Sequence, residues 1–122
     1  AAALDKKYEI PFNGKYSWLY AGEAAIAFIT SVNKDLTGSH VFNLNGSCET
    51  IEYGLSLIKE LSKEANITCV NKSFPFPPDL DDLPLRNHIG DYPSISVKKG
   101  IEHTFRAFEI LKSEGRCPSL SE

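Results

Sequence analysis

The chain has 122 residues, of which 42% are hydrophobic, and this is enough to bury one core. Its net charge is −3 and its basic residues are scattered among acidic ones, so we expect neither a nucleic-acid partner nor a membrane partner. Residues 24–30, the longest apolar stretch, are too few to span a bilayer, and the N-terminus lacks the pattern of a signal peptide. These features predict a cytoplasmic protein.

The N-terminal part predicts two strands and a helix. Residues 8–12 and 15–20 are rich in aromatic and β-branched residues, and Asn13 with Gly14 between them predicts the turn of a hairpin. Residues 21–32 predict a helix with one apolar face, which we expect to be buried: Ala21, Ala24, Ala25, Phe28, Ile29 and Val32. Its alanines would let another backbone approach closely.

The central part predicts a βαβ unit. Residues 40–44 indicate a short strand, and Asn45 with Gly46 indicates a tight turn after it. A helix then begins after Thr50, which can accept hydrogen bonds from its first N–H groups, and its apolar face is formed by Ile51, Leu55, Ile58 and Leu61. Residues 67–70 indicate a second strand, placed where a crossover returns parallel to the first.

The C-terminal part predicts an extended arm and two helices. Residues 74–78 contain three prolines and are expected to be an arm on the surface. Asp81 or Asp82 can cap a short helix that ends at Gly90. Ser96 begins the last helix, which ends at Gly115 and has a buried stripe of Val97, Ile101, Phe105, Phe108 and Leu111. The fold class is therefore mixed α/β.

Few side chains in the sequence suggest a catalytic, metal-binding or ligand-binding site. The acidic cluster of Asp79, Asp81 and Asp82 has the composition of a metal or proton-sharing site, but the same residues also suit helix capping. Neither the histidines nor the cysteines have ligand spacing, so we predict no metal site. Three aromatic residues share one face of a predicted strand and could line either a ligand pocket or the core: Tyr16, Trp18 and Tyr20.

Three stretches together carry a resemblance. Residues 10–20 followed by Ala21-Gly-Glu-Ala-Ala25 look like a strand leading into a Val-Asp-Asp-Val-Ala helix start, with the acids reduced to Glu23. Residues 38–46 followed by Thr50 are similar to a G-x-x-[YF]-N-[LV]-x-G strand and its helix, and residues 86–101 to an R-x-x-L-G-x-x-P ending, with Lys98 and Lys99 where acids are usual. In this order they resemble the C-terminal portion of extended short-chain dehydrogenase/reductases, the NAD-dependent epimerase/dehydratase family.

The resemblance implies that residues 1–122 form one C-terminal substrate-binding domain of a longer enzyme, a lobe of short strands and about four helices beside a Rossmann domain. It implies a sugar-nucleotide or sugar-acid substrate and epimerase, dehydratase or dehydrogenase activity with NAD or NADP, with residues 14–20 and 74–82 lining the substrate pocket. Without the Rossmann domain, the face that packs beside it would be exposed, so we expect a homo-oligomer with residues 1–4 and 74–78 near the contact. The Rossmann domain would lie upstream or on a partner chain. The substrate-binding residues that it implies are Lys15, Tyr16, Trp18, Tyr20, Phe76 and Arg86.

The family's catalytic and cofactor motifs do not occur in this sequence. None of the five tyrosines has a lysine four residues later, and the glycine-rich turn that holds a dinucleotide is missing. We therefore assign no catalytic and no cofactor-binding residue to the chain. The alternative is a stand-alone, non-catalytic ligand-binding or assembly module with the same fold.

Overall fold

The computed structural model describes residues 1–35 and 37–117, and within them the chain forms four α-helices, one 3-10 turn and two two-stranded sheets. In chain order the elements are η1 (Ala2–Leu4), β1 (Tyr8–Ile10), β2 (Lys15–Trp18), α1 (Ala21–Val32), β3 (Ser47–Thr50), α2 (Ile51–Leu61), β4 (Ile67–Cys69), α3 (Leu83–Ile89) and α4 (Val97–Ser113). The expected mixed α/β fold class is confirmed. None of the helices in this described part is both long and apolar enough to cross a membrane.

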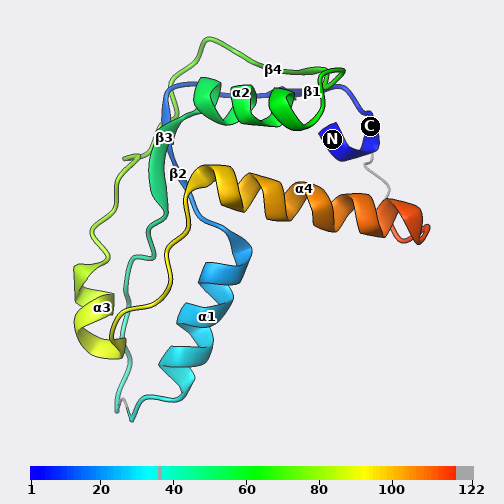
Figure 1. Cartoon of the computed structure of the whole chain (residues 1–122). Helices are drawn as coiled ribbons and strands as arrows, with labels where there is room; N and C mark the ends of the chain where they lie inside the picture. Colours follow the sequence, from blue (N-terminus) through cyan, green and yellow to red (C-terminus); the bar gives the residue numbers. More distant parts are fainter. Residues whose placement is uncertain (36, 118–122) are drawn as a thin grey trace.

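Two groups of elements make up the molecule (Figure 1). α2 lies along α4, η1 packs against the C-terminal half of α4, and β1 with β4 lies beside α2. α1 and α3 lie together at the other end, where they extend away from α4. β2 and β3 connect the two groups, so side chains on β2 can contact both of them.

The predicted N-terminal hairpin is wrong. β1 pairs in parallel with β4, with Tyr8 opposite Ile67, whereas β2 pairs antiparallel with β3, with Lys15 opposite Thr50. The reason lies at Asn13, whose N–H donates to the carbonyl of Lys72 and whose carbonyl accepts from Phe74. This pairing continues the β1–β4 ladder instead of reversing the chain.

The predicted strand at residues 40–44 is also wrong, since these residues are extended but unpaired and β3 begins only at Ser47. Asn45 and Gly46 do not form a turn. A Cβ atom on Gly46 would lie 2.1 Å from the carbonyl oxygen of Trp18, so glycine serves the close approach of two backbones here. β4 forms where it was predicted and is parallel, but its partner is β1 rather than residues 40–44.

The helix boundaries agree with the capping pattern of the sequence. The hydroxyl of Thr50 accepts the N–H of Tyr53 at the start of α2, and that of Ser96 accepts the N–H of Lys99 at the start of α4. α4 ends at Ser113, and Gly115 two residues later has a φ of 67°, the left-handed conformation expected of a terminating glycine.

The buried face of α1 differs from the predicted one. Its bounds are as expected, but Glu23 and Ala27 are buried while Phe28, Ile29 and Val32 are exposed by 69%, 62% and 83%. The cause is the carboxylate of Glu23, which accepts the backbone N–H of Tyr20 at the start of α1 and that of Ile95 before α4, and so turns the Glu23 and Ala27 face inward. Ala27 packs there with three residues from the region of α3, namely Leu85, Ile89 and Tyr92.

Candidate functional site

Five aromatic side chains from two distant segments form a continuous cluster, called here the aromatic cluster: Phe12, Tyr16, Trp18, Phe74 and Phe76. The ring of Tyr16 is at its centre, edge-on to Phe74 with 4.9 Å between ring centroids and edge-on to Trp18 at 6.1 Å. Phe76 extends the cluster from Phe74 at 5.4 Å and is 66% exposed. The cluster therefore has a buried side and a side open to solvent.

Backbone pairing positions the two segments. Tyr16 and Trp18 lie two residues apart on β2 and so share one face of that strand. The arm that carries Phe74 is held to the same region by the bridge between Asn13 and Ser73. Strand alternation thus selects which aromatic rings of β2 can meet the arm.

Trp18 is fixed from a second side. Its indole N–H donates to the carbonyl of Glu49 at 3.2 Å, and its ring lies against Gly54 of α2, where a Cβ atom would come within 2.3 Å of Trp18 Cη2. Gly54 is therefore a packing position for the indole. This indole connects the aromatic cluster to the interior between α2 and α4.

A chain of polar side chains runs beside the cluster. The hydroxyl of Ser17 donates to Asn45 Oδ1 at 2.7 Å and accepts the N–H of Gly46 at 2.9 Å. The Asn45 amide in turn donates to Asp79 Oδ1 at 2.8 Å. These bonds attach the arm to the segment before β3, and they occupy the Gly46 N–H that a phosphate would need.

The three acidic residues after the arm have separate roles. Asp79 accepts from Asn45, Asp81 accepts the N–H of Leu83 at 3.0 Å, and Asp82 pairs with Arg86. Asp82 is the N-cap residue of α3, but its side chain makes no cap hydrogen bond; the carboxylate of Asp81 instead binds the first N–H group of the helix. Within residues 1–35 and 37–117 no group of three or more ligating side chains could hold a metal ion.

Asp82, Arg86 and Tyr92 form a half-buried ion-pair cluster on α3. Asp82 Oδ2 accepts from Arg86 Nε at 3.1 Å, from Arg86 Nη2 at 3.0 Å and from the Tyr92 hydroxyl, while the guanidinium lies 4.1 Å from the Tyr92 ring centroid. Burial acts to raise the pKa of Asp82, but the hydrogen bonds from Arg86 and Tyr92 and the charge of Arg86 outweigh it and lower the pKa. Burial, followed by the hydrogen bond to Asp82, raises the pKa of Tyr92 to about 12.

A cavity of about 290 Å³ opens on the other side of Trp18. Its wall comes from η1, the end of β2, α2 and the apolar stripe of α4, and includes Trp18, Tyr20, Ile58, Val97, Gly100 and Phe105. Among the described residues that line it there is no charged side chain. We refer to it below as the apolar cavity.

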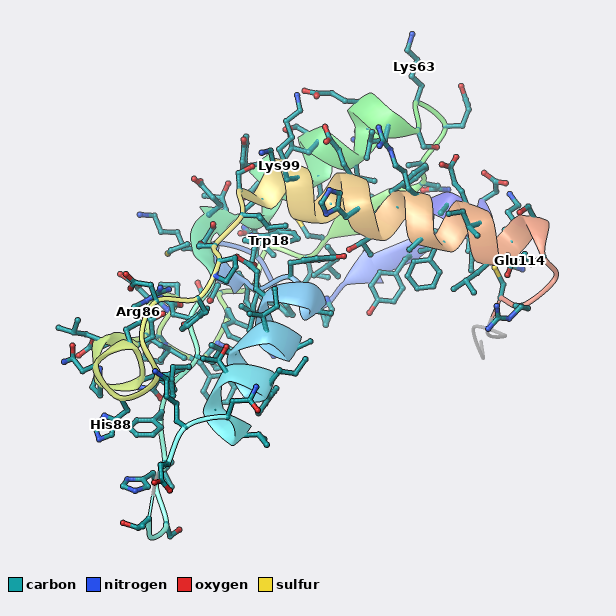
Figure 2. All side chains as sticks on the ribbon, turned by 60° about the horizontal axis from the view of Figure 1, so that its bottom comes forward. Trp18, Lys63, Arg86, His88, Lys99 and Glu114 are labelled. Carbon is teal, nitrogen blue, oxygen red and sulfur yellow. The ribbon has the colours of Figure 1, made fainter. Side chains whose placement is uncertain are left out.

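The structure separates the residues that the family resemblance implies. Tyr16, Trp18 and Phe76 come together in the aromatic cluster, and Trp18 and Tyr20 line the apolar cavity. Lys15 begins β2 with an exposed side chain and lies in neither. Arg86 is on α3, well away from Trp18 in Figure 2, with three of its nitrogen atoms bonded to Asp82 and to the carbonyl of Tyr92.

Sequence reasoning missed several members of both sites. Phe12 and Phe74 belong to the cluster, although neither was singled out; Phe74 could have been found, since it is in the same proline-rich arm as Phe76. The α4 residues of the cavity had a signal in their helical periodicity, but periodicity does not distinguish a cavity wall from a filled core.

Comparison of the chain with protein-family models and with curated proteins gives no match. The functional argument therefore depends on the motifs of the sequence and on the geometry of the aromatic cluster and the apolar cavity.

Proposed function

We propose that the chain is the substrate-binding lobe of an NAD(P)-dependent enzyme of the extended short-chain dehydrogenase/reductase type, acting on a sugar nucleotide or sugar acid. The observation that carries the proposal is the contact between Tyr16 and Phe74, with 4.9 Å between ring centroids. Residues 14–20 and residues 74–82 are the two segments expected to line the substrate pocket, and this contact joins them.

The chemistry of the surface suits such a substrate. Flat aromatic faces such as the exposed ring of Phe76 bind the apolar faces of sugar rings and stack on nucleobases. Lys15, exposed at the start of β2, provides a positive charge for a phosphate or carboxylate group. Arg86 would have to leave Asp82 before it could bind a substrate, so we give it a supporting role in this proposal.

The proposed lobe needs a cofactor domain from elsewhere. The Asn45-Gly46 segment before β3, which the sequence predicted as a strand-to-helix turn, does not fit a dinucleotide, because the Gly46 N–H is bonded to Ser17 and its Cα lies against the Trp18 carbonyl. Binding of NAD(P) and hydride transfer would belong to a Rossmann domain, upstream or on a partner chain. Exposed apolar side chains on α1 offer a surface for such a partner or for a second copy.

Titration with UDP-glucose, UDP-glucuronate and free glucuronate tests the proposal, with the fluorescence of Trp18, the one tryptophan in the chain, as the readout. We expect saturable binding that is weakened at least about tenfold in Phe76→Ala, a change of about 1.4 kcal/mol. Phe28→Ala, which removes an equally exposed ring on α1, is the matched control and should bind like the unmodified chain. If all three ligands bind with dissociation constants weaker than about 10 mM, less than about 3 kcal/mol, the proposal is wrong.

The reading frame upstream of Ala1 provides a second test. A glycine-rich Rossmann turn and a Tyr-x-x-x-Lys pair in that frame would support the proposal. A stop codon directly upstream, combined with a stable isolated chain, would favour the non-catalytic ligand-binding module instead. The apolar cavity is the observation that favours this second function.

A further inference from the structure

The apolar cavity lies outside the proposed sugar surface and has a different chemistry. It lies between η1, α2 and α4, and the Trp18 indole separates it from the aromatic cluster. Its described lining has no charged side chain, so it is unsuited to a sugar phosphate. A ligand in this cavity must therefore be of another class.

Gly100 keeps the cavity open. Gly54 of α2 is needed because the Trp18 indole occupies the space of its side chain. A Cβ atom on Gly100 would instead have its nearest neighbours at ordinary contact distances, Tyr20 Cβ at 3.4 Å, Ile95 Cδ1 at 3.8 Å and Tyr20 Cγ at 3.9 Å. A glycine inside a helix weakens that helix relative to alanine. At Gly100 neither close packing nor a positive φ explains the glycine, whereas an open cavity beside α4 does.

The lining defines the ligand class. Besides the Trp18 indole, whose N–H is bonded to the carbonyl of Glu49, its polar side chains are the hydroxyls of Tyr20, Ser96 and Thr104. The Thr104 hydroxyl already donates its proton to the carbonyl of Gly100 at 2.8 Å, so it can only accept another hydrogen bond. Such a wall favours a neutral molecule with an apolar body and at most a few hydrogen-bonding atoms.

The volume sets the ligand size. A dry cavity of about 150 Å³ lined by aliphatic and aromatic side chains binds benzene. At about 290 Å³, the apolar cavity has room for two rings or for a chain of about ten carbons. From the size, the lack of charged side chains in the described wall and the glycine beside it, we propose that the apolar cavity is a binding site for a neutral, two-ring or medium-chain apolar molecule.

The probe is N-phenyl-1-naphthylamine, a neutral dye with two aromatic ring systems, a phenyl and a naphthyl group, whose fluorescence rises in apolar surroundings. We expect saturable, one-to-one binding with energy transfer from Trp18, which lines the cavity. Gly100→Leu fills the cavity and should weaken the affinity at least tenfold. Ala107→Leu adds the same side chain on an exposed position of the same helix and should leave the affinity unchanged.

Two further variants and a second dye control for misfolding and for binding elsewhere on the chain. If Gly100→Leu fails to fold by its melting curve, Thr104→Phe replaces it, because Thr104 lies at the exposed rim of the cavity and can carry a larger side chain. Phe28→Ser should bind the dye normally, which distinguishes the cavity from the exposed apolar face of α1. The anionic dye 8-anilinonaphthalene-1-sulfonate should bind at least tenfold more weakly than the neutral one.

Three results would overturn the inference: no saturable binding of the neutral dye, equal affinity in the cavity-filled and unmodified chains, or equal affinity for the neutral and anionic dyes. None of them depends on the proposed sugar-binding function. Phe76→Ala, the variant expected to lose sugar binding, should retain dye binding because Phe76 does not line the cavity.

Discussion

The buried carboxylate of Glu23 accepts a hydrogen bond from the backbone N–H of Ile95, which is 72 residues away in the sequence. Its other oxygen accepts the N–H of Tyr20 at 3.1 Å. One side chain thus holds the start of α1 against the segment that leads into α4, close to the wall of the apolar cavity.

Glu23→Ala should lower the free energy of unfolding by about 2–4 kcal/mol, because it leaves two backbone N–H groups without an acceptor in a buried place. Glu23→Gln retains one acceptor oxygen and should lose less. Urea unfolding followed by Trp18 fluorescence measures both. Glu52→Ala, on the exposed side of α2, is the control, and a Glu23→Ala chain as stable as this control would contradict the role of Glu23.

Gly46→Ala and Gly100→Ala should change stability in opposite directions. On Gly46 a Cβ atom would lie 2.1 Å from the carbonyl oxygen of Trp18, and since backbone atoms cannot move aside easily, we expect a loss of about 1–3 kcal/mol. On Gly100 the Cβ atom fits and improves the helix, for a gain of about 0.5–1 kcal/mol. Thermal unfolding of the two variants side by side is the measurement, and a shift of both in the same direction would refute the comparison.

Tyr92 should give the chain a stability that declines at alkaline pH. Its pKa is raised to about 12 in the folded chain, whereas in the unfolded chain tyrosine ionises near pH 10. A raised pKa stabilises the fold fully below pH 10, and this contribution is lost as the pH rises from about 10 to about 12.

When tyrosinate absorbance is followed as the pH is raised, one tyrosine should accordingly ionise late, at about pH 12. Tyr92→Phe should remove that late step and should also lower stability at neutral pH by about 1–2 kcal/mol, since Asp82 loses a donor. Tyr53→Phe, which changes an exposed tyrosine, should keep the step. If the late ionisation step is still present in Tyr92→Phe, that step belongs to another residue.

The isolated chain should not bind NAD+ or NADP+ measurably. The Gly46 N–H is already bonded to Ser17, and Glu49 lies close by in β3, where its carboxylate would repel a pyrophosphate. Calorimetric titration is the direct measurement. A dissociation constant at or below about 100 μM, worth about 5.5 kcal/mol, would mean that the fold provides a phosphate site that the Gly46 geometry does not reveal.

We expect self-association, and α1 adds a third surface to the two segments that the sequence suggested, residues 1–4 and the arm at residues 74–78. Ala2 is buried, whereas Phe76 in the arm is 66% exposed. The exposed apolar side chains of α1 form a further contact surface, and Phe28→Glu with Ile29→Lys should reduce the association. Sedimentation velocity over a range of concentrations measures it, with Ile110→Lys on α4 as the control; a monomer at every concentration would exclude this expectation.

Local signals in the sequence were sufficient for the helices. Thr50, Ser96 and Gly115 define helix ends through their own hydroxyl groups or backbone conformation, so they act within one turn of the chain. Local signals were not sufficient to predict which face of α1 is buried. The buried face depends on Glu23 meeting Ile95, and no pattern within residues 21–32 contains that contact.

Strand pairing was the weakest part of the prediction for the same reason. Asn13-Gly14 has the composition of a hairpin turn, but the bonds of Asn13 to residues 72 and 74 decide its conformation. For the candidate site, β2 alternation correctly placed Tyr16 and Trp18 on one face. That the arm meets this face, and that Trp18 also borders a cavity, follows only from the packing of distant segments.

The pairing of the strands determines the order in which the chain can fold. Tyr8 lies opposite Ile67 and Lys15 opposite Thr50, so neither sheet can begin as a local hairpin and both require the closure of long loops. Two-stranded sheets are also marginal without a packed face. Helices form within about a microsecond, and α2 can dock on α4 before any strand has a partner. We therefore expect the strands to pair last, on helices that are already assembled.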